Sequence, residues 1–189
     1  MKGNKMNEQI IITIKGGILL PNNKVQWGPE KRANSFVLNF LKSLAFCMGS
    51  IDTQPVNDQG TAGTPGRNAG WWTVNAANDR YHGIWIGTGN TAVTRSQYNL
   101  ATPITTGYTC YLTQISLSEV GTNTHRISIT REIKNTSGGT WDLKEVCLFI
   151  VGYFGTNWYA FMIERSLYEL TVYNGNTCRY EYQINVTLP

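Results

Sequence analysis

The sequence predicts a mainly β protein, an antiparallel β-sandwich of jelly-roll or immunoglobulin-like topology with one N-terminal α-helix. Short apolar runs with polar alternation recur along the chain, and turns rich in Gly, Asn and Pro separate them. Only 15% of the 189 residues are charged and 12% are aromatic, which argues against a coiled coil, a helical bundle or a charged disordered chain. We expect a strand arm over residues 1–28, a helix over 29–48, a loop over 49–70 and a sandwich body over 71–189.

The first part of the chain is typical of short strands. Gln9–Lys15 is rich in β-branched residues, and Gly16-Gly17 is expected to turn the chain before a strand at Ile18–Leu20. Pro21-Asn-Asn then predicts a second turn, followed by a strand at Lys24–Trp27.

One helix is predicted after this arm. Pro29 suits a first helical position, Glu30 suits the positive end of the helix dipole, and Gly49 is a natural stop. Apolar residues recur between these ends at helical spacing, at Phe36, Val37, Phe40, Leu41, Leu44 and Met48. The wide apolar face predicts that the helix packs on a sheet or on another subunit.

Residues 49–70 form a long run of small polar residues with Gly and Pro. A loop of this length is expected either as a plain surface loop or as an interaction loop that orders against a partner. Trp71 and Trp72 follow it, and adjacent residues of a strand point to opposite faces, so one of them needs a cover or a partner.

The body is predicted to consist of strands and turns. Strands are expected at Trp71–Val74, Tyr81–Ile86, Tyr108–Ser118, Thr124–Lys134, Leu143–Val151, Trp158–Glu164, Leu167–Tyr173 and Cys178–Leu188. Thr88–Thr106 is expected to be a long connection, and Asn135–Thr140 and Asn174-Gly175 are turn signals.

Three of these strands carry expectations about burial. Ile127, Ile129 and Ile133 alternate with polar residues and are predicted to point inward. Leu143–Val151 is almost wholly apolar, which predicts a central strand covered on both faces. Cys178–Leu188 alternates strictly, which predicts one buried and one solvated face.

The positive charge is concentrated at the N-terminus. Residues 1–42 hold seven basic and two acidic side chains, whereas residues 43–189 hold nine basic and ten acidic ones. A basic arm bearing Lys2, Lys5 and Lys15 could meet an acidic neighbouring subunit or, with weaker support, nucleic acid. The arm hypothesis predicts that deletion of residues 1–28 leaves a folded but unassembled monomer.

The motifs that could carry chemistry favour structural interpretations. Gly87-Thr-Gly-Asn-Thr-Ala92 has the spacing of a dinucleotide-binding turn, but no helical pattern follows it, so the glycines are expected to allow a sharp turn. His82 and His125 have no partners at metal spacing. Glu145 enters an apolar strand and is expected to pair with Lys144, Arg131 or a backbone amide. We therefore predict no enzyme, no cofactor and no metal.

The spacing of the cysteines and the hydropathy of the chain bear on the cellular compartment in which the protein is made. Cys47, Cys110, Cys147 and Cys178 lie far apart and are expected to be free thiols, mostly buried, although their redox state is left open. The apolar runs are strand-sized, and the N-terminus does not read as a signal peptide. We expect no membrane partner and synthesis in a host cytoplasm.

One resemblance covers roughly residues 81–188. It is carried by Gly83–Val93, Tyr98–Ile104, Arg126–Gly139, Glu145–Phe149, Phe161–Arg165 and Val172–Thr177. In the order of these segments the chain resembles small β-sandwich structural proteins of tailed-phage and related virus particles. The resemblance implies a role in assembly and no catalytic residues. The chain departs from the pattern at Cys147, where such patterns often have Gly, and in its N-terminal strand and helix.

The predicted function is therefore a structural virion protein, part of a capsid, its decoration, a tail or a fibre. Its expected partners are copies of itself and other virion proteins. The candidate interface residues are Trp71, Trp72, Phe36, Phe40, Lys2, Lys5 and Lys15. The alternative is a carbohydrate- or receptor-binding sandwich that uses Trp71 or Trp72 together with the loops at 49–70 and 88–106.

Overall fold

The computed structural model describes residues 9–33, 78–154 and 157–187, and these form two antiparallel sheets. The strands are β1 (Gln9–Leu19), β2 (Val25–Trp27), β3 (Lys31–Arg32), β4 (Gly83–Gly87), β5 (Tyr108–Cys110), β6 (Gln114–Gly121), β7 (Thr124–Asn135), β8 (Trp141–Phe154), β9 (Asn157–Val172) and β10 (Thr177–Thr187). The larger sheet, sheet A, has the order β2-β1-β10-β7-β5, with β3 beside β1 and β6 beside β7. Sheet B has the order β4-β8-β9. The mainly β, antiparallel class is confirmed.

The first strand differs from its prediction. β1 runs without a break through Gly16 and Gly17 and pairs with β10 from Gln9 to Leu19, so the expected turn at these glycines is wrong. A Cβ at Gly16 would lie 2.5 Å from the Tyr180 ring, because that ring packs directly on the strand. The glycine therefore makes room for an aromatic side chain. Because β1 lies inside sheet A, residues 9–19 are not a separable arm.

The start of the predicted helix is also wrong. Lys31–Arg32 forms β3, which pairs with Thr13 and Ile14 of β1. The backbone at these two residues takes part in a sheet, which competes with the helix that Pro29 and Glu30 favoured. Among the described residues there is no α-helix. The rest of the predicted helix and loop (34–70) and the predicted strand at Trp71–Val74 lie outside the described residues.

Two predicted strands differ in continuity. The strand expected over Tyr108–Ser118 is divided into β5 and β6, and both parts pair with β7. The two strands expected between Trp158 and Tyr173 are one strand, β9, which pairs with β8 through two register irregularities. The polar Arg165-Ser166 does not interrupt β9, because Arg165 has a buried partner on β8.

Other predictions are confirmed. Residues 145–151 of β8 are all buried at the centre of sheet B. The predicted Thr88–Thr106 connection contains no strand beyond an isolated bridge between Gly87 and Pro103. The turn at Asn174-Gly175 joins β9 to β10, and Gly175 has a φ of 83°. Cys178, Tyr180 and Tyr182 on one face of β10 are buried, as the alternation predicts. The prediction fails toward the end of the strand, where Ile184 and Val186 are only half-buried and Gln183 of the predicted solvated face is buried.

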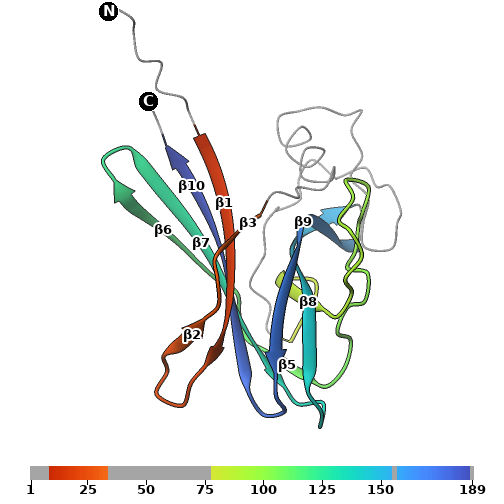
Figure 1. Ribbon diagram of the computed structural model, residues 1–189. Coiled ribbons are helices and arrows are strands. Elements are labelled where there is room, and N and C mark those ends of the chain that lie inside the picture. The colour runs from red at the N-terminus through yellow and green to blue at the C-terminus, as the bar shows by residue number, and fades with distance from the viewer. Residues whose placement is uncertain (1–8, 34–77, 155–156, 188–189) are drawn as a thin grey trace, which may run out of the picture.

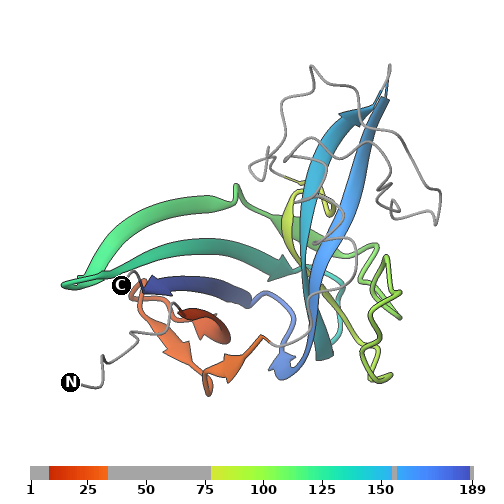
Figure 2. The same cartoon turned by 90° about the horizontal axis from the view of Figure 1, so that it is seen from above.

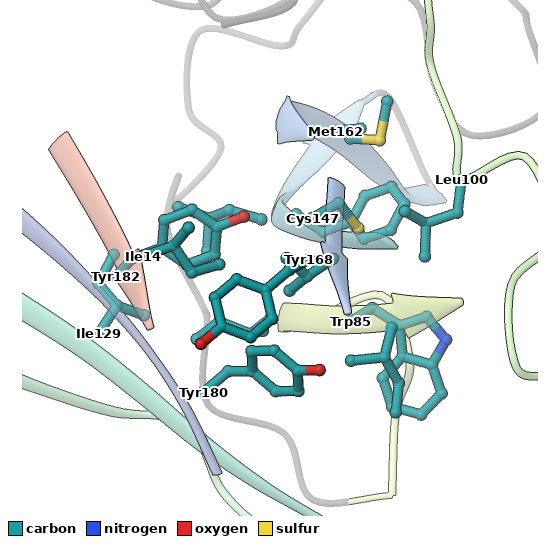
Figure 3. Close-up of a cluster of buried hydrophobic side chains, with 14 of the residues drawn as sticks. Ile14, Trp85, Leu100, Ile129, Cys147, Met162, Tyr168, Tyr180 and Tyr182 are labelled. Atoms are coloured by element: carbon teal, nitrogen blue, oxygen red, sulfur yellow. The ribbon is translucent and has the colours of Figure 1, made fainter. Parts of the chain in front are cut away.

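The hydrophobic core lies between the two sheets. Figure 3 shows Tyr180 and Tyr182 of sheet A close to Tyr168 of sheet B, with Trp85 and Cys147 farther from the strands of sheet A. The rings of Tyr168 and Tyr180 meet edge to face at 5.7 Å, and the Tyr168 hydroxyl donates to the carbonyl of Gly16. We call the face of sheet A that carries Tyr180 and Tyr182 the inner face.

Sheet B covers only part of the inner face. Both views show the β6–β7 hairpin and the neighbouring ends of β1 and β10 extending away from β8 and β9 (Figures 1 and 2). The covered part contains Ile133, Cys178 and Tyr180, all fully buried.

Candidate functional site

A buried carboxylate organises the connection between β4 and β5. Glu145 of β8 accepts hydrogen bonds from the backbone amides of Gly89 (3.1 Å), Ala101 (3.0 Å) and Thr102 (2.7 Å). Arg165 of β9 adds two charged donors, Nε at 2.8 Å and Nη2 at 2.7 Å. Neither side chain has any exposed surface. The expected backbone-amide partner is confirmed, and the charged partner is Arg165 in place of Lys144 or Arg131.

Arg165 extends the same cluster into the connection. Its Nη1 donates to the Thr91 carbonyl at 3.1 Å and to Gln97 Oε1 at 3.0 Å. Both ends of the ion pair therefore hold the connection against sheet B. Since the carboxylate oxygens and the guanidinium all have partners inside the fold, the pair supports a structural role and not acid–base catalysis.

The same carboxylate explains why glycines occur at 87 and 89, where β4 leads into this connection. A Cβ at Gly89 would lie 2.7 Å from Glu145 Oε1, and a Cβ at Gly87 would lie even closer to the same oxygen. The backbone over residues 88–94 forms no turn or bend, so the expected sharp turn is wrong and the glycines serve close approach. The Gly89 amide already donates to a carboxylate, which would also repel a phosphate; this argues against a dinucleotide site.

A second buried cation joins the two sheets. Arg131 of β7 is 1% exposed, and burial lowers its pKa. Its guanidinium donates to the carbonyls of Asp79 (2.6 Å), His82 (2.5 Å), Ile84 (3.2 Å) and Tyr111 (3.1 Å) and to Cys110 Sγ (3.3 Å). Arg131 thus ties β4 and the residues before it to β7.

A buried acid lies in the interface between the two sheets. Glu164 of β9 accepts hydrogen bonds from Ser166 Oγ (2.5 Å) and from the hydroxyl of Tyr182 on β10. Burial raises the pKa of Glu164 to about 7, and burial also raises the pKa of Tyr182 well above its usual value. This pair links sheet B to sheet A by a polar contact inside an apolar core.

The described residues hold no group of three His, Cys, Asp or Glu side chains that could bind a metal ion. His82 Nδ1 lies 2.8 Å from Asp79, and the two side chains belong to no such group. Cys110, Cys147 and Cys178 are free and buried, as predicted, and burial raises the pKa of each thiol. Cys47 lies outside the described residues.

The most distinctive surface feature is the part of the inner face of sheet A that sheet B does not cover, which we call the open part. Two cross-strand rows lead from its covered to its open part: Ile14, Tyr182, Ile129 and Ile115, then Ile12, Ile184, Ile127 and Leu117. Exposure rises along each row toward β6, from 8% at Ile129 to 54% at Ile115 and from 36% at Ile127 to 73% at Leu117. Of the three isoleucines predicted to point inward on β7, Ile129 and Ile133 are buried and Ile127 is at the open part.

The opposite face of sheet A is polar. Lys15 pairs with Glu181 at 3.0 Å, and Arg179 pairs with Glu132. Polar cross-strand pairs are expected on a solvated sheet face, so the contrast between the two faces is strong.

The predicted interface residues are placed as follows. Lys15 is half-buried on β1, where its ammonium also lies 4.5 Å from the centroid of the Trp27 ring, so it is engaged within the chain. Lys2, Lys5, Phe36, Phe40, Trp71 and Trp72 lie outside the described residues. Sequence reasoning did not include Ile115 and Leu117 among the candidate interface residues, although the alternation of apolar and polar residues over 114–118 is a strand signal.

Comparison of the chain with protein-family models, with curated proteins and with solved structures found no match. No helix long and apolar enough to span a bilayer occurs in the described ranges.

Proposed function

We propose that this chain is a structural subunit that assembles with copies of itself through sheet A, as a component of a virus particle. The observation that carries the proposal is the concentration of apolar surface at one place. Of the ten large hydrophobic side chains that are exposed within the described residues, six lie between residues 111 and 127: Tyr111, Leu112, Ile115, Leu117, Val120 and Ile127. Exposed apolar surface of this kind marks interaction sites.

The interior supports the same proposal. The two buried glutamates, Glu145 and Glu164, form hydrogen bonds with side chains inside the fold. The proposal includes a sandwich body of jelly-roll or immunoglobulin-like type, with sheet B covering one part of sheet A and another subunit adjoining the part that sheet B leaves open. Its proposed partners are other virion proteins, and its proposed location is the virion. The resemblance over residues 81–188 to virion β-sandwich proteins supports both.

The test is the mass of the purified full chain in solution, measured by light scattering after size exclusion, with the same fractions imaged by electron microscopy. The proposal expects a defined oligomer, ring, tube or shell. A monomer of 21.2 kDa that persists at about 1 mM protein contradicts self-assembly.

A second candidate is a carbohydrate-binding module, and one observation favours it. A hollow of about 330 Å³ is lined by Tyr111, Leu112, Gln114, Thr130, Arg131 and Glu132. An exposed aromatic ring beside polar side chains can stack on and hydrogen-bond to a sugar. This candidate expects saturable glycan binding that Tyr111→Ala abolishes, with Tyr173→Ala, another exposed tyrosine, as the control. The absence of binding across a glycan array contradicts it.

A further inference from the structure

We propose that β6 of one copy pairs with β6 of a second copy, antiparallel, about a twofold axis that passes through Ser116. This inference rests on the proposed self-assembly and specifies its contact. The pairing would join two copies of sheet A into one continuous sheet with both inner faces on the same side.

The first argument is the state of the β6 edge. Within the described residues β6 pairs only with β7, and all eight of its residues are exposed. Proteins usually protect such an edge with Lys, Pro, a bulge or a very short strand. β6 contains no Lys or Pro, and its single irregularity is confined to Glu119–Gly121.

The other side of sheet A shows the usual protection. There β2 has three residues and β3 has two, and β3 consists of Lys31 and Arg32. One side of the sheet is therefore short and charged, while the other offers a long strand with one acidic residue. A long unprotected strand is the feature expected of an edge that is covered in the working assembly.

The second argument is that the β6 sequence is complementary to itself in one register. With Ser116 on the axis, Ile115 faces Leu117 of the second copy, and Gln114 faces Ser118 of the second copy. Apolar residues then meet on the inner face and polar residues meet on the opposite face. Glu119 faces Thr113, so no carboxylate meets another.

Neighbouring registers lack this complementarity. A twofold axis perpendicular to the sheet pairs residues of the same face, so the possible centres are single residues. A centre at Leu117 sets Ile115 against Glu119, and a centre at Ile115 sets Leu117 against Thr113. Each would place an apolar side chain against a polar one on the inner face.

The pairing also continues the apolar rows. Leu117 and Ile127 of one copy would be followed by Ile115 and Ile129 of the second copy, across the axis. The most exposed large hydrophobic side chain in the described ranges, Leu117, would then lie beside the centre of the interface instead of at a free edge. A contact of this kind is isologous and closed, so it yields a dimer and not a fibre.

Charge at the axis tests the register. In Ser116→Lys two ammonium groups face each other across the axis, whereas in Ser118→Lys each lysine faces Gln114. Both serines are exposed, so both variants are expected to fold. We expect wild type at twice 21.2 kDa, a dissociation constant raised at least about tenfold by Ser116→Lys, and a change below about threefold for Ser118→Lys.

Cross-linking tests the position of the axis. Residues that face each other in antiparallel strands have Cα atoms roughly 4.5–5.5 Å apart, within the range of a disulfide. Ser116→Cys should therefore form a covalent dimer with an oxidant such as copper phenanthroline, the two thiols losing two electrons to two Cu(II) ions and two protons to the buffer. Two copies of Ser118→Cys would be about 13 Å apart along the strands and should not cross-link.

Wild type and Ser118→Cys also serve as controls for disulfides formed by the native Cys47. A covalent dimer specific to Ser116→Cys, together with dissociation by Ser116→Lys alone, supports the pairing. An oligomer that survives Ser116→Lys and gives no cross-link at residue 116 overturns the β6 contact while the proposed self-assembly stands. A monomeric wild type overturns both.

Discussion

Removal of the buried carboxylate at Glu145 is the most informative perturbation of the fold. Glu145→Ala would leave the Arg165 guanidinium, which has no exposed surface, without its counter-charge, and three backbone amides would lose their acceptor. Breaking a buried ion pair from one side costs roughly 3–5 kcal/mol. We expect a loss in this range and not a larger one, because the β4–β5 connection can move and expose its amides to water.

Equilibrium urea unfolding followed by circular dichroism measures this loss. With a denaturant dependence of about 2 kcal/mol per molar urea, the midpoint should fall by about 2 M. Since single domains are stable by about 5–15 kcal/mol, Glu145→Ala should still fold or be close to the limit. The isosteric Glu145→Gln is the safer variant, and it should also destabilise by about 2 kcal/mol or more because an amide cannot balance the Arg165 charge.

The matched control is Glu132→Ala, which breaks the partly exposed pair with Arg179. It should cost less than about 1 kcal/mol, since solvent screens such a pair. A local measurement separates a loosened connection from general destabilisation: trypsin should cut after the exposed Arg95 faster in Glu145→Gln than in wild type. If Glu145→Gln changes stability by less than about 0.5 kcal/mol and leaves this cleavage unchanged, the assigned role of the carboxylate is wrong.

Three further predictions concern other buried groups. The pKa of Glu164 is raised to about 7 in the folded protein, so the folded state binds more protons than the unfolded state between about pH 4.5 and 7. The contribution of Glu164 to the free energy of unfolding therefore falls by about 3 kcal/mol as the pH rises through this window. Glu164→Gln should flatten that dependence, and an unchanged difference in unfolding free energy between pH 5 and pH 7.5 would contradict the assignment. Gly16→Ala should cost about 1–3 kcal/mol because its Cβ meets the Tyr180 ring, whereas Gly139→Ala, which meets no atom within 4 Å, should change stability by less than about 0.5 kcal/mol. Equal effects of the two glycine substitutions in thermal unfolding would refute the packing argument. Arg131→Lys should destabilise by about 2–3 kcal/mol, since an ammonium cannot reach the carbonyls of Asp79, His82 and Tyr111 together; urea unfolding within 0.5 kcal/mol of wild type would refute this.

The arm hypothesis predicted that deletion of residues 1–28 leaves a folded monomer, but in this fold we expect that deletion to unfold the protein. Residues 1–28 include β1, whose Ile12 and Ile14 are buried and which pairs with β10 along its whole length. Their removal would expose the core of sheet A, so a deletion confined to residues 1–8 is the appropriate test of the basic residues Lys2 and Lys5.

Strand periodicity by itself determined much of the fold. Alternation over Cys178–Leu188 predicted β10 and its buried face, and the apolar run at Leu143–Val151 predicted a strand buried on both sides. The turns after Asn135 and at Asn174-Gly175 were also predicted, because their residues favour the local backbone of a turn. These features depend on neighbours in the sequence, which a single chain displays directly.

Tertiary contacts decided the rest. Gly16 stays within a strand because an aromatic ring from β10 packs on it, and Gly17 because β2 lies against it. Strand β9 continues through Arg165 because Arg165 forms a buried ion pair with Glu145 of the neighbouring strand β8. Lys31 and Arg32 form a strand beside β1, against the local signals for a helix. Ile115 and Leu117 have the same alternation as buried residues of β10, yet they are exposed because sheet B ends before it reaches them. Whether an apolar residue is buried depends on which distant strand covers it, and the pattern of one strand carries no information about the extent of another.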